Sequence, residues 1–179
     1  MSLDKLSNQL SGIESKMPPV ELWNPPYCGE IDIRIAADGT WYYLGAPFKR
    51  IALVKLFASV LKKEQDDYYL VTPVEKIKII VEDAPFVLTQ WQWQAQDEQT
   101  MVVATNLDDE FVLNNEHPVT INCQDQLYVT VRRNLTAKVH RNVYYQWVDL
   151  AQSNQTPQGT ELFFTSAGQR FSIGTFKED

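Results

Sequence analysis

The order of the expected secondary-structure elements repeats along this chain of 179 residues, and that repeat constrains the fold more than any other feature. Apolar and polar residues alternate over residues 31–35, and Asp38-Gly39 supplies a hairpin turn, so two paired strands are expected. A helix is expected over residues 48–63, where apolar residues recur at helical spacing, and a strand over residues 68–71. The first third is therefore expected to contain a hairpin, a helix and a strand, in that order.

The last third of the chain has the same order. A hairpin is expected over residues 119–131, a helix over residues 140–152, a loop over residues 153–159 and a strand over residues 162–165. Residues 143–148 would also suit a strand, but the length of the segment and its lack of Gly and Pro favour a helix. Few residues are identical, so the repeat is one of pattern. We therefore expect an α+β fold of two similar lobes made by internal duplication, with mostly antiparallel sheets that each carry a helix.

Prolines and apolar spacing divide the chain into three segments. Apolar residues recur at helical spacing from Leu3 to Ile13, so an amphipathic N-terminal helix is expected within residues 1–18. Consecutive prolines then end it. The N-terminal α+β lobe is expected over residues 19–84 and the C-terminal lobe over residues 85–179.

The strand patterns also predict the core. Gln and Trp alternate over residues 90–94, so both tryptophans of this segment share one face of a strand. An aromatic content of 12% fits buried sheet faces better than exposed stacking platforms. The side chains expected in the core include Ile31, Ile33, Trp41, Tyr43, Trp91, Trp93 and Val129.

The composition favours a cytoplasmic protein. The first residues mix charged with apolar side chains, unlike a secretory leader, and no run approaches the roughly 18 apolar residues of a membrane span. The net charge of -7 disfavours nonspecific nucleic-acid binding, which needs a surplus of Lys and Arg. Cys28 and Cys123 lie far apart, so both are expected as reduced, mostly buried thiols. The oligomeric state stays open.

Motifs for catalysis or metal binding are scarce. His117 and His140 have no second ligand at metal-binding spacing, so no metal site is expected. The 7 glycines are scattered singly and form neither a P-loop nor a dinucleotide fingerprint. Glu82 and Asp83 directly follow a strand, and such a pair can bind a ligand hydroxyl or amine, or serve in acid–base chemistry. A solvated turn is the alternative interpretation of this pair.

Basic residues precede both predicted helices in this acidic chain. Lys49-Arg50 stand before the first helix and His140-Arg141 before the second. A cation at a helix N-terminus is unfavourable by a few tenths to about 1 kcal/mol, unless an anion also binds there. Together with Arg133, these residues predict a phosphorylated ligand near the helix starts, between the lobes and close to Glu82. The alternative is that they only pair with surface carboxylates.

Several stretches of the chain resemble one bacterial family. They are Asp38-Gly39-Thr40-Trp41, Gly45-Ala46-Pro47, residues 69–76 and residues 81–86, with less distinct matches over residues 134–137 and 143–145. From about Pro19 onward the chain is similar to the domain-of-unknown-function family DUF1285, found mainly in proteobacteria. The resemblance implies a duplicated core and a C-terminal lobe superficially similar to pleckstrin-homology folds. It also implies a ligand site between the lobes, for a nucleotide-like molecule in signal transduction, and supplies no catalytic residues.

Three classes of function stay open. The first is a ligand-binding or sensory module that takes a phosphorylated small molecule. The second is an interaction module in which an exposed strand edge, such as residues 90–94, binds a protein partner. The third is an enzyme that uses Glu82 or Asp83 as acid or base.

Overall fold

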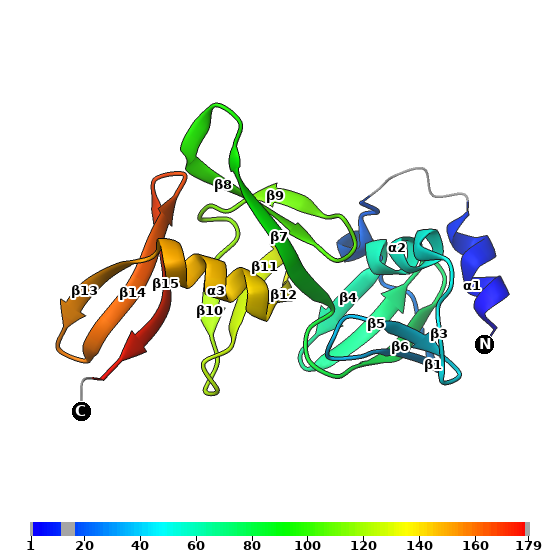
Figure 1. Cartoon of the computed structure of the whole chain (residues 1–179). Coiled ribbons are helices and arrows are strands. Elements are labelled where there is room, and N and C mark those ends of the chain that lie inside the picture. The colour runs from blue at the N-terminus through cyan, green and yellow to red at the C-terminus, as the bar shows by residue number, and fades with distance from the viewer. Residues whose placement is uncertain (1, 12–16, 178–179) are drawn as a thin grey trace. The chain divides into compact units, whose positions relative to one another are not determined.

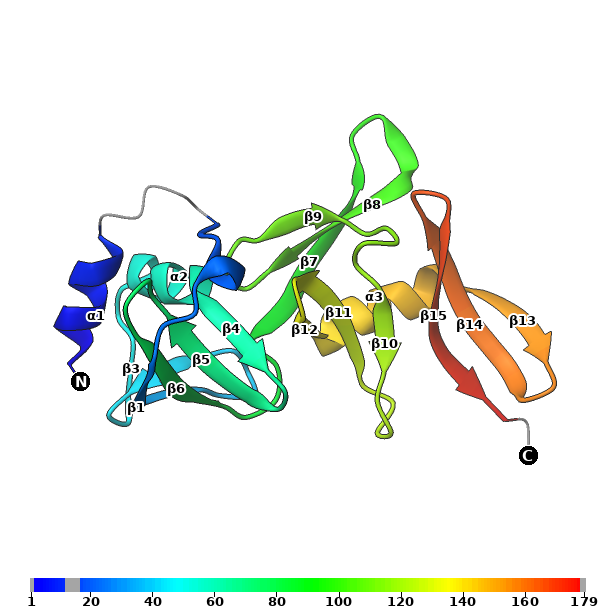
Figure 2. The same cartoon turned by 180° about the vertical axis from the view of Figure 1, so that it is seen from behind.

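The computed structural model describes residues 2–11 and 17–177. The chain forms two compact units, residues 1–83 and residues 84–179, and each has its own six-stranded sheet (Figure 1, Figure 2). Ile13, which was expected in the N-terminal helix, lies outside the described residues. None of the helices in the described part of the chain is long and apolar enough to cross a membrane.

A mixed sheet forms the body of the first unit. The elements are α1 (Leu3–Leu10), the 3-10 helix η1 (Val20–Leu22), β1 (Tyr27–Ile35), β2 (Trp41–Tyr43), β3 (Ala46–Pro47), α2 (Ile51–Ser59), β4 (Leu61–Glu64), β5 (Asp67–Val71) and β6 (Lys76–Val81). The strand order is β3-β2-β1-β6-β5-β4. The central pair, β1 and β6, is parallel, and the other neighbours are antiparallel. Two three-stranded meanders therefore lie side by side.

The core of the first unit follows from the alternation in its strands. Ile31, Ile33 and Ile35 of β1 are buried, as the sequence predicts, and Phe57 of α2 is fully buried with them. Burial of a side chain of this size contributes about 1.5–3 kcal/mol, so these residues hold the sheet and α2 together.

Helix α2 is shorter than the sequence predicts. Arg50 is its N-cap and the helix ends at Ser59, whereas a helix over residues 48–63 was expected. Residues 61–64 instead form β4, which pairs with β5 through a turn at Gln65, where φ is +55°. The helical spacing continued into this segment, but hydrogen bonding to a neighbouring strand overrides so weak a local preference.

The second unit contains a half-barrel and a smaller sheet. Its elements are β7 (Phe86–Gln94), β8 (Asp97–Thr105), β9 (Glu110–Val112), β10 (Val119–Ile121), β11 (Leu127–Arg132), β12 (Leu135–Val139), α3 (Arg141–Leu150), β13 (Gln152–Thr156), β14 (Gly159–Ser166) and β15 (Gln169–Phe176). The larger sheet has the order β10-β11-β12-β7-β8-β9 and curls into a half-barrel (Figure 2). The smaller sheet has the order β13-β14-β15. The helix expected after His140 is confirmed as α3.

The two six-stranded sheets have the same topology. In each, the first strand of one meander pairs in parallel with the last strand of the other, β1 with β6 and β7 with β12. The helices differ in place, because α2 connects the two meanders whereas α3 follows the last strand. The α+β class and a helix with each sheet are thus confirmed.

The predicted alignment of the two halves was wrong. The hairpin over residues 119–131 corresponds in strand order to β4 and β5, and not to β1 and β2. Residues 162–165 belong to β14 in the small sheet, which has no counterpart among the described residues of the first unit. The expected loop over residues 153–159 contains most of β13 and a tight turn. Hairpins are common, so their order alone did not identify the matching strands.

Several residues expected to be buried are more exposed. Ile31, Ile33, Trp41 and Val129 are buried, but Tyr43, Trp91 and Trp93 are only half-buried. Cys28 and Cys123 are exposed free thiols, which corrects the expectation of buried ones. The tryptophans are half-covered because β12 pairs with β7 only over Phe86 to Leu88, so the rest of β7 extends past it.

Candidate functional site

The predicted site residues of the first unit lie at two places. Lys49 and Arg50 are exposed at the start of α2, where Arg50 makes no side-chain capping hydrogen bond and the first turn has no acidic residue. Glu82 is exposed after β6, next to Asp83, which is half-buried. The start of α2 therefore keeps the features that favour an anion, namely free backbone N–H groups and basic side chains.

Glu82 is held as an ionised hydrogen-bond acceptor. The amide N–H of Ala37 donates to Oε2 at 3.0 Å, and Arg34 Nη1 donates to Oε1. The Ala37 N–H first, and then the Arg34 guanidinium, keep the pKa of the Glu82 carboxyl below its usual range. Arg34 also stacks over the ring of Tyr42, with 4.5 Å from its central carbon to the ring centroid. This carboxylate closes the turn between β1 and β2, and an acid–base role would need a raised pKa instead.

In the second unit, His140 and Arg141 lie together at the start of α3. The Asn142 N–H donates to Nδ1 of His140 at 3.2 Å, so the imidazole itself caps the helix. Arg133 lies in the turn between β11 and β12, with φ +53°. Strand β12 separates Arg133 from His140, and five residues of strand span about 17 Å. Arg133 is thus not part of the same cluster.

The second unit also contains a cavity that the sequence did not reveal, here named the aromatic pocket. Its volume is about 290 Å³. Trp93 of β7, Leu150 at the end of α3 and Phe164 of β14 form its apolar walls. Residues from the start of β8, from β13 and from the β14–β15 hairpin complete the lining: Glu98, Gln99, Gln152, Thr165 and Gly168.

The walls of the aromatic pocket are braced from behind by other aromatic rings. Trp93 packs edge-to-face against Trp91, with ring centroids 5.6 Å apart, and the Trp91 indole N–H donates to Oε1 of Gln146 on α3 at 2.7 Å. Phe164 packs against the fully buried Trp147, with centroids 4.9 Å apart. Both wall rings are therefore positioned by α3, so the pocket is preformed.

Hydrogen bonds fix the hairpin that carries the other side of the pocket. The Ala167 N–H donates to the Gln99 carbonyl at 2.9 Å, at the turn between β14 and β15. The buried Ser166 hydroxyl donates to the Leu113 carbonyl at 2.7 Å and accepts from the Met101 N–H at 2.9 Å. The small sheet is thus attached to the half-barrel beside the aromatic pocket.

The charge of the lining residues determines which class of ligand the aromatic pocket can bind. Glu98 is the one charged side chain that lines it, and no cationic residue does among those described. The second unit carries six basic and eleven acidic residues, so its surroundings are also negative. An indole face attracts cations, whereas a phosphate here would meet only a carboxylate and neutral groups. The sequence signal that was available is the Gln-Trp alternation, which is typical of a half-exposed strand face.

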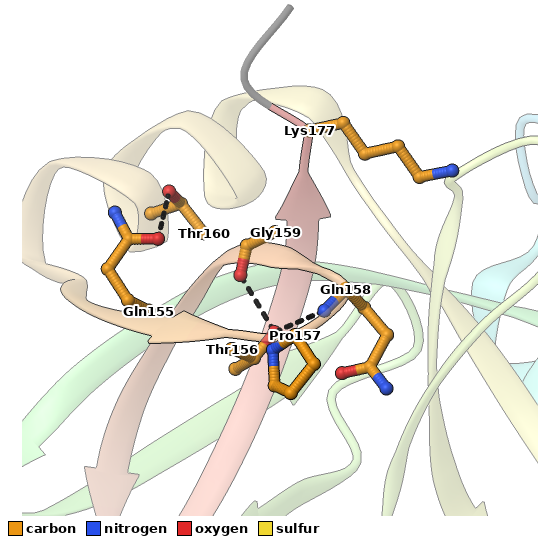
Figure 3. A pocket seen from close by; sticks show the side chains of 7 residues that line it. All are labelled: Gln155, Thr156, Pro157, Gln158, Gly159, Thr160 and Lys177. Atoms are coloured by element: carbon orange, nitrogen blue, oxygen red, sulfur yellow. Dashed lines mark hydrogen bonds between the residues drawn. The ribbon is translucent and has the colours of Figure 1, made fainter.

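A second, polar hollow lies at the turn between β13 and β14 (Figure 3). The Thr156 hydroxyl donates to the Gly159 carbonyl at 2.7 Å and accepts from the Gln158 N–H at 3.3 Å. The Thr160 hydroxyl donates to Oε1 of Gln155 at 3.2 Å, and Lys177 completes the lining. We name this hollow the polar groove. The hydroxyls of Thr156 and Thr160 are thus already paired with other groups of the groove.

The described residues contain no cluster of three or more His, Cys, Asp or Glu side chains arranged to hold a metal ion. His117 instead stacks on Phe111, with ring centroids 4.2 Å apart, and its Nδ1 lies 2.8 Å from the Thr130 carbonyl.

Comparison with known proteins identifies the family. Residues 18–84 match the N-terminal domain of the domain-of-unknown-function family DUF1285, and residues 85–173 match its C-terminal domain. A DUF1285 family protein from Silicibacter pomeroyi DSS-3 has a crystal structure similar to this chain, with 39% sequence identity and a TM-score of 0.80, over 95% of this chain and 94% of that one. No curated protein matches the chain.

A second crystal structure, of a DUF1285 family protein from Shewanella baltica OS155, is 32% identical with a TM-score of 0.54. It covers 65% of this chain and 90% of that one. Both domains of the family follow one another here in a single chain, which therefore belongs to the DUF1285 family.

Proposed function

We propose that this chain is a ligand-binding protein whose second unit holds an organic amine in the aromatic pocket. The observation that supports this most is the pairing of the Trp93 and Phe164 walls with Glu98, the only charged residue of the lining among those the structure describes. A cation over an aromatic face gains about 0.5–2 kcal/mol, and a nearby carboxylate adds to that attraction. The ligand has an apolar body, which fits between the rings, and an ammonium group that lies beside Trp93 and Glu98.

The volume of the aromatic pocket limits the size of the ligand. A volume of about 290 Å³ lies at the lower end of the range for small-molecule sites, so a single aromatic ring with a short chain fills it. Gln99 and Gln152 line the pocket, and their amide oxygens and N–H groups suit a hydroxyl or a peptide bond next to the ammonium group.

Three probes of similar size test this proposal: phenethylamine, 2-phenylethanol and phenylacetate. They share a ring and a short chain, and they differ in charge. Titration followed by the indole N–H resonance of Trp93, assigned with the Trp93→Phe variant, should show binding in the order amine, alcohol, anion. Glu98→Gln should reduce the affinity for the amine about threefold and leave that for the alcohol unchanged, because an exposed charge contributes at most about 1 kcal/mol.

The matched control is Glu116→Gln, which removes a carboxylate from another exposed part of the same unit. It should leave all three affinities as they are. Equal binding of phenylacetate and phenethylamine would overturn the proposal, as would a Trp93 resonance that none of the probes shifts.

A second candidate function is the binding of a phosphorylated small molecule at the start of α2. The specific observation in its favour is that Arg50 and Lys49 remain exposed beside a helix N-terminus that lacks both a side-chain cap and an acidic residue in its first turn. In contrast, the start of α3 is already capped by His140. The phosphorylated ligand is therefore proposed for the first unit alone, and a role in cytoplasmic signalling stays a prediction.

The shared strand order also supports a proposal about origin. We infer that the two units arose by duplication of one six-stranded ancestor, because a parallel pair flanked by two meanders occurs in both. The helix then occupies different positions, and the small sheet β13-β14-β15 is an addition to the second unit. A likeness of the half-barrel with its final helix to pleckstrin-homology folds belongs to the same proposal.

A further inference from the structure

We propose that the outer edge of β13 is a docking site for an extended, basic segment of a partner protein, which places one cationic side chain in the aromatic pocket. This inference rests on the proposed function of that pocket. Strand β13 pairs with β14 through a register without a bulge, and among the described residues it has no strand on its other side. Its outward N–H and C=O groups can therefore pair with an added strand.

The sequence of β13 lacks the devices that normally protect a sheet edge. Natural edge strands are shortened, bent by bulges, or carry Lys or Pro. The five residues Gln-Ser-Asn-Gln-Thr are neither charged nor proline, and the first four are exposed. The edge strands of the half-barrel, β9 and β10, have only three residues each. The other edge of the small sheet, β15, carries Arg170, contacts β10 and pairs with β14 through an irregular register, so in the second unit β13 is the edge most suited to accept a strand.

The position of β13 gives the added strand an anchor. Gln152, its first residue, lines the aromatic pocket, and Gln155 and Thr156, near its end, line the polar groove. Five residues of strand span about 17 Å. A segment laid along this edge therefore begins at a cavity with aromatic walls and ends beside Lys177, which can bind a carbonyl or a carboxylate of the segment.

Charge selects the kind of partner. The second unit has five more acidic than basic residues, and Glu98 lines the aromatic pocket. A segment with Lys or Arg is attracted, and its cationic side chain matches the indole of Trp93. A second copy of this chain is disfavoured as the occupant, because it would bring together two units of like charge.

The segment over residues 90–94, which the sequence suggested as an interaction edge, is less suitable. β12 does not pair with this part of β7, but α3 contacts β7, and its Gln146 accepts a hydrogen bond from Trp91, so the helix lies beside the strand. The Gln-rich strand thus supplies a wall of the aromatic pocket through Trp93, and β13 supplies the edge.

The test uses the full chain and a display library of random peptides of about twelve residues, long enough to cover the strand and its flanks. Selection should enrich peptides with Lys or Arg at alternate positions. The best peptide, made synthetically, should slow hydrogen exchange of the amides in β13, and phenethylamine should compete with it. Trp93→Ala should weaken the peptide about tenfold, through loss of the cation–π contact and the wall.

Two proline variants isolate the edge itself. Neighbouring residues of a strand direct their N–H groups to opposite sides, so one of Ser153→Pro and Asn154→Pro removes an outward donor and keeps the pairing with β14. The variant of the two that keeps the wild-type melting temperature should lose the peptide at least tenfold. Ser172→Ala, in β15, is the control and should bind the peptide normally.

The outcomes separate this inference from the proposed function. If phenethylamine binds but no selected peptide protects β13 from exchange, the proposal that β13 is a docking edge is rejected. The proposal that the aromatic pocket binds an amine is then kept. If a peptide protects β13 and binds the Trp93→Ala protein with unchanged affinity, the proposal that its cationic side chain lies in the aromatic pocket is rejected. Protection of β13 by self-association, seen as dimers in sedimentation at rising protein concentration, would make a second copy the occupant and reject the basic segment.

Discussion

The amide N–H of Met101 donates to the side-chain oxygen of Ser166 at 2.9 Å, and both residues are fully buried. The same hydroxyl donates its own hydrogen to the Leu113 carbonyl at 2.7 Å. One serine thus satisfies two backbone groups of the half-barrel from the end of β14. Since Phe164 and Thr165 precede it on β14, this contact also sets the position of one wall of the aromatic pocket.

Ser166→Ala should lower the free energy of unfolding by about 1–3 kcal/mol, because the Met101 N–H and the Leu113 carbonyl lose a buried partner. Urea titration of both proteins measures this difference. Ser172→Ala, on the same hairpin but half-buried, should change stability by less than about 0.5 kcal/mol. Equal effects of the two substitutions would show that the bridge contributes nothing specific.

The strands with alternating residues were predictable from the sequence, and the strands formed by long-range pairing were not. Ile31, Ile33 and Ile35 mark β1 because every second side chain is apolar. Residues 61–64 continue the helical spacing of α2, yet they pair with β5. Strand β13 has only polar residues, so its conformation depends on the β14 partner and leaves no apolar pattern.

The candidate site was predictable only in part, since its residues come from distant segments. The pattern around Trp93 predicts its sheet face but not how much of that face is covered, which depends on where β12 ends. Phe164 and Leu150 reach the same cavity only because the β14–β15 hairpin is fixed beside β8. The basic residues at the two helix starts were predictable because they precede both predicted helices in an otherwise acidic chain. The structure leaves Arg133 separated from His140 by β12.

Gly159 should be the glycine of the small sheet that tolerates substitution least. Its φ is +131°, and a Cβ there would lie 2.3 Å from the carbonyl oxygen of Phe176, on the neighbouring strand. Gly168 also has positive φ, +73°, but its Cβ would meet open space. Gly168→Ala should therefore lower stability by about 1 kcal/mol, from backbone strain alone.

Gly159→Ala adds a steric clash with backbone to that strain, so its effect should exceed that of Gly168→Ala by at least about 1 kcal/mol. Thermal unfolding of the two variants, followed by circular dichroism, provides the comparison. A Gly159→Ala protein that is as stable as Gly168→Ala would mean that the end of β15 does not approach Gly159 so closely in solution.

The double variant Lys49→Ala/Arg50→Ala should lose any stabilisation by inorganic pyrophosphate. If pyrophosphate binds at the start of α2, a hundredfold excess over its dissociation constant stabilises the protein by about 2.7 kcal/mol, which a thermal-shift assay detects. Removing both cations should abolish that shift.

Arg141→Ala is the control for this experiment, because α3 is already capped by His140 and should not contribute. A pyrophosphate shift that survives in the Lys49→Ala/Arg50→Ala protein, but is lost in Arg141→Ala, would transfer the anion site to α3. A flat response of the wild-type protein would leave these basic residues as surface charge.

The docking of α1 should depend on pH through Glu75. Lys5 Nζ lies 2.6 Å from Oε1 of this carboxylate, and Gln9 Nε2 donates to Oε2 at 3.1 Å, while Leu6 and Leu10 are buried beneath them. The Lys5 hydrogen bond chiefly, with the one from Gln9, holds the pKa of Glu75 below its ordinary value. The same pairing, first through its hydrogen bond, raises the pKa of Lys5.

The direction of each pH effect follows from the difference in pKa between the docked and the undocked state of α1. A carboxyl whose pKa is lower in the docked state stabilises docking above its ordinary pKa of about 4.3, and this contribution is lost as the pH falls through the lowered value. The raised Lys5 pKa stabilises docking below the ordinary lysine pKa of about 10.4, and this contribution is lost as the pH rises through the raised value. Docking should therefore be strongest between these two limits.

The methyl resonances of Leu6 and Leu10, followed by NMR from about pH 3 to about pH 7, report the acid side of this dependence. Wild-type protein should show the two methyl groups moving toward the positions of an undocked helix as Glu75 is protonated. Glu75→Gln cannot titrate and should show a weaker helix contact that is independent of pH over the same range. Lys5→Gln removes the charge and should shift the wild-type transition to higher pH, because the carboxyl then loses the partner that lowers its pKa. Identical titration curves for wild type and Glu75→Gln would show that burial of the two leucines alone holds α1 in place.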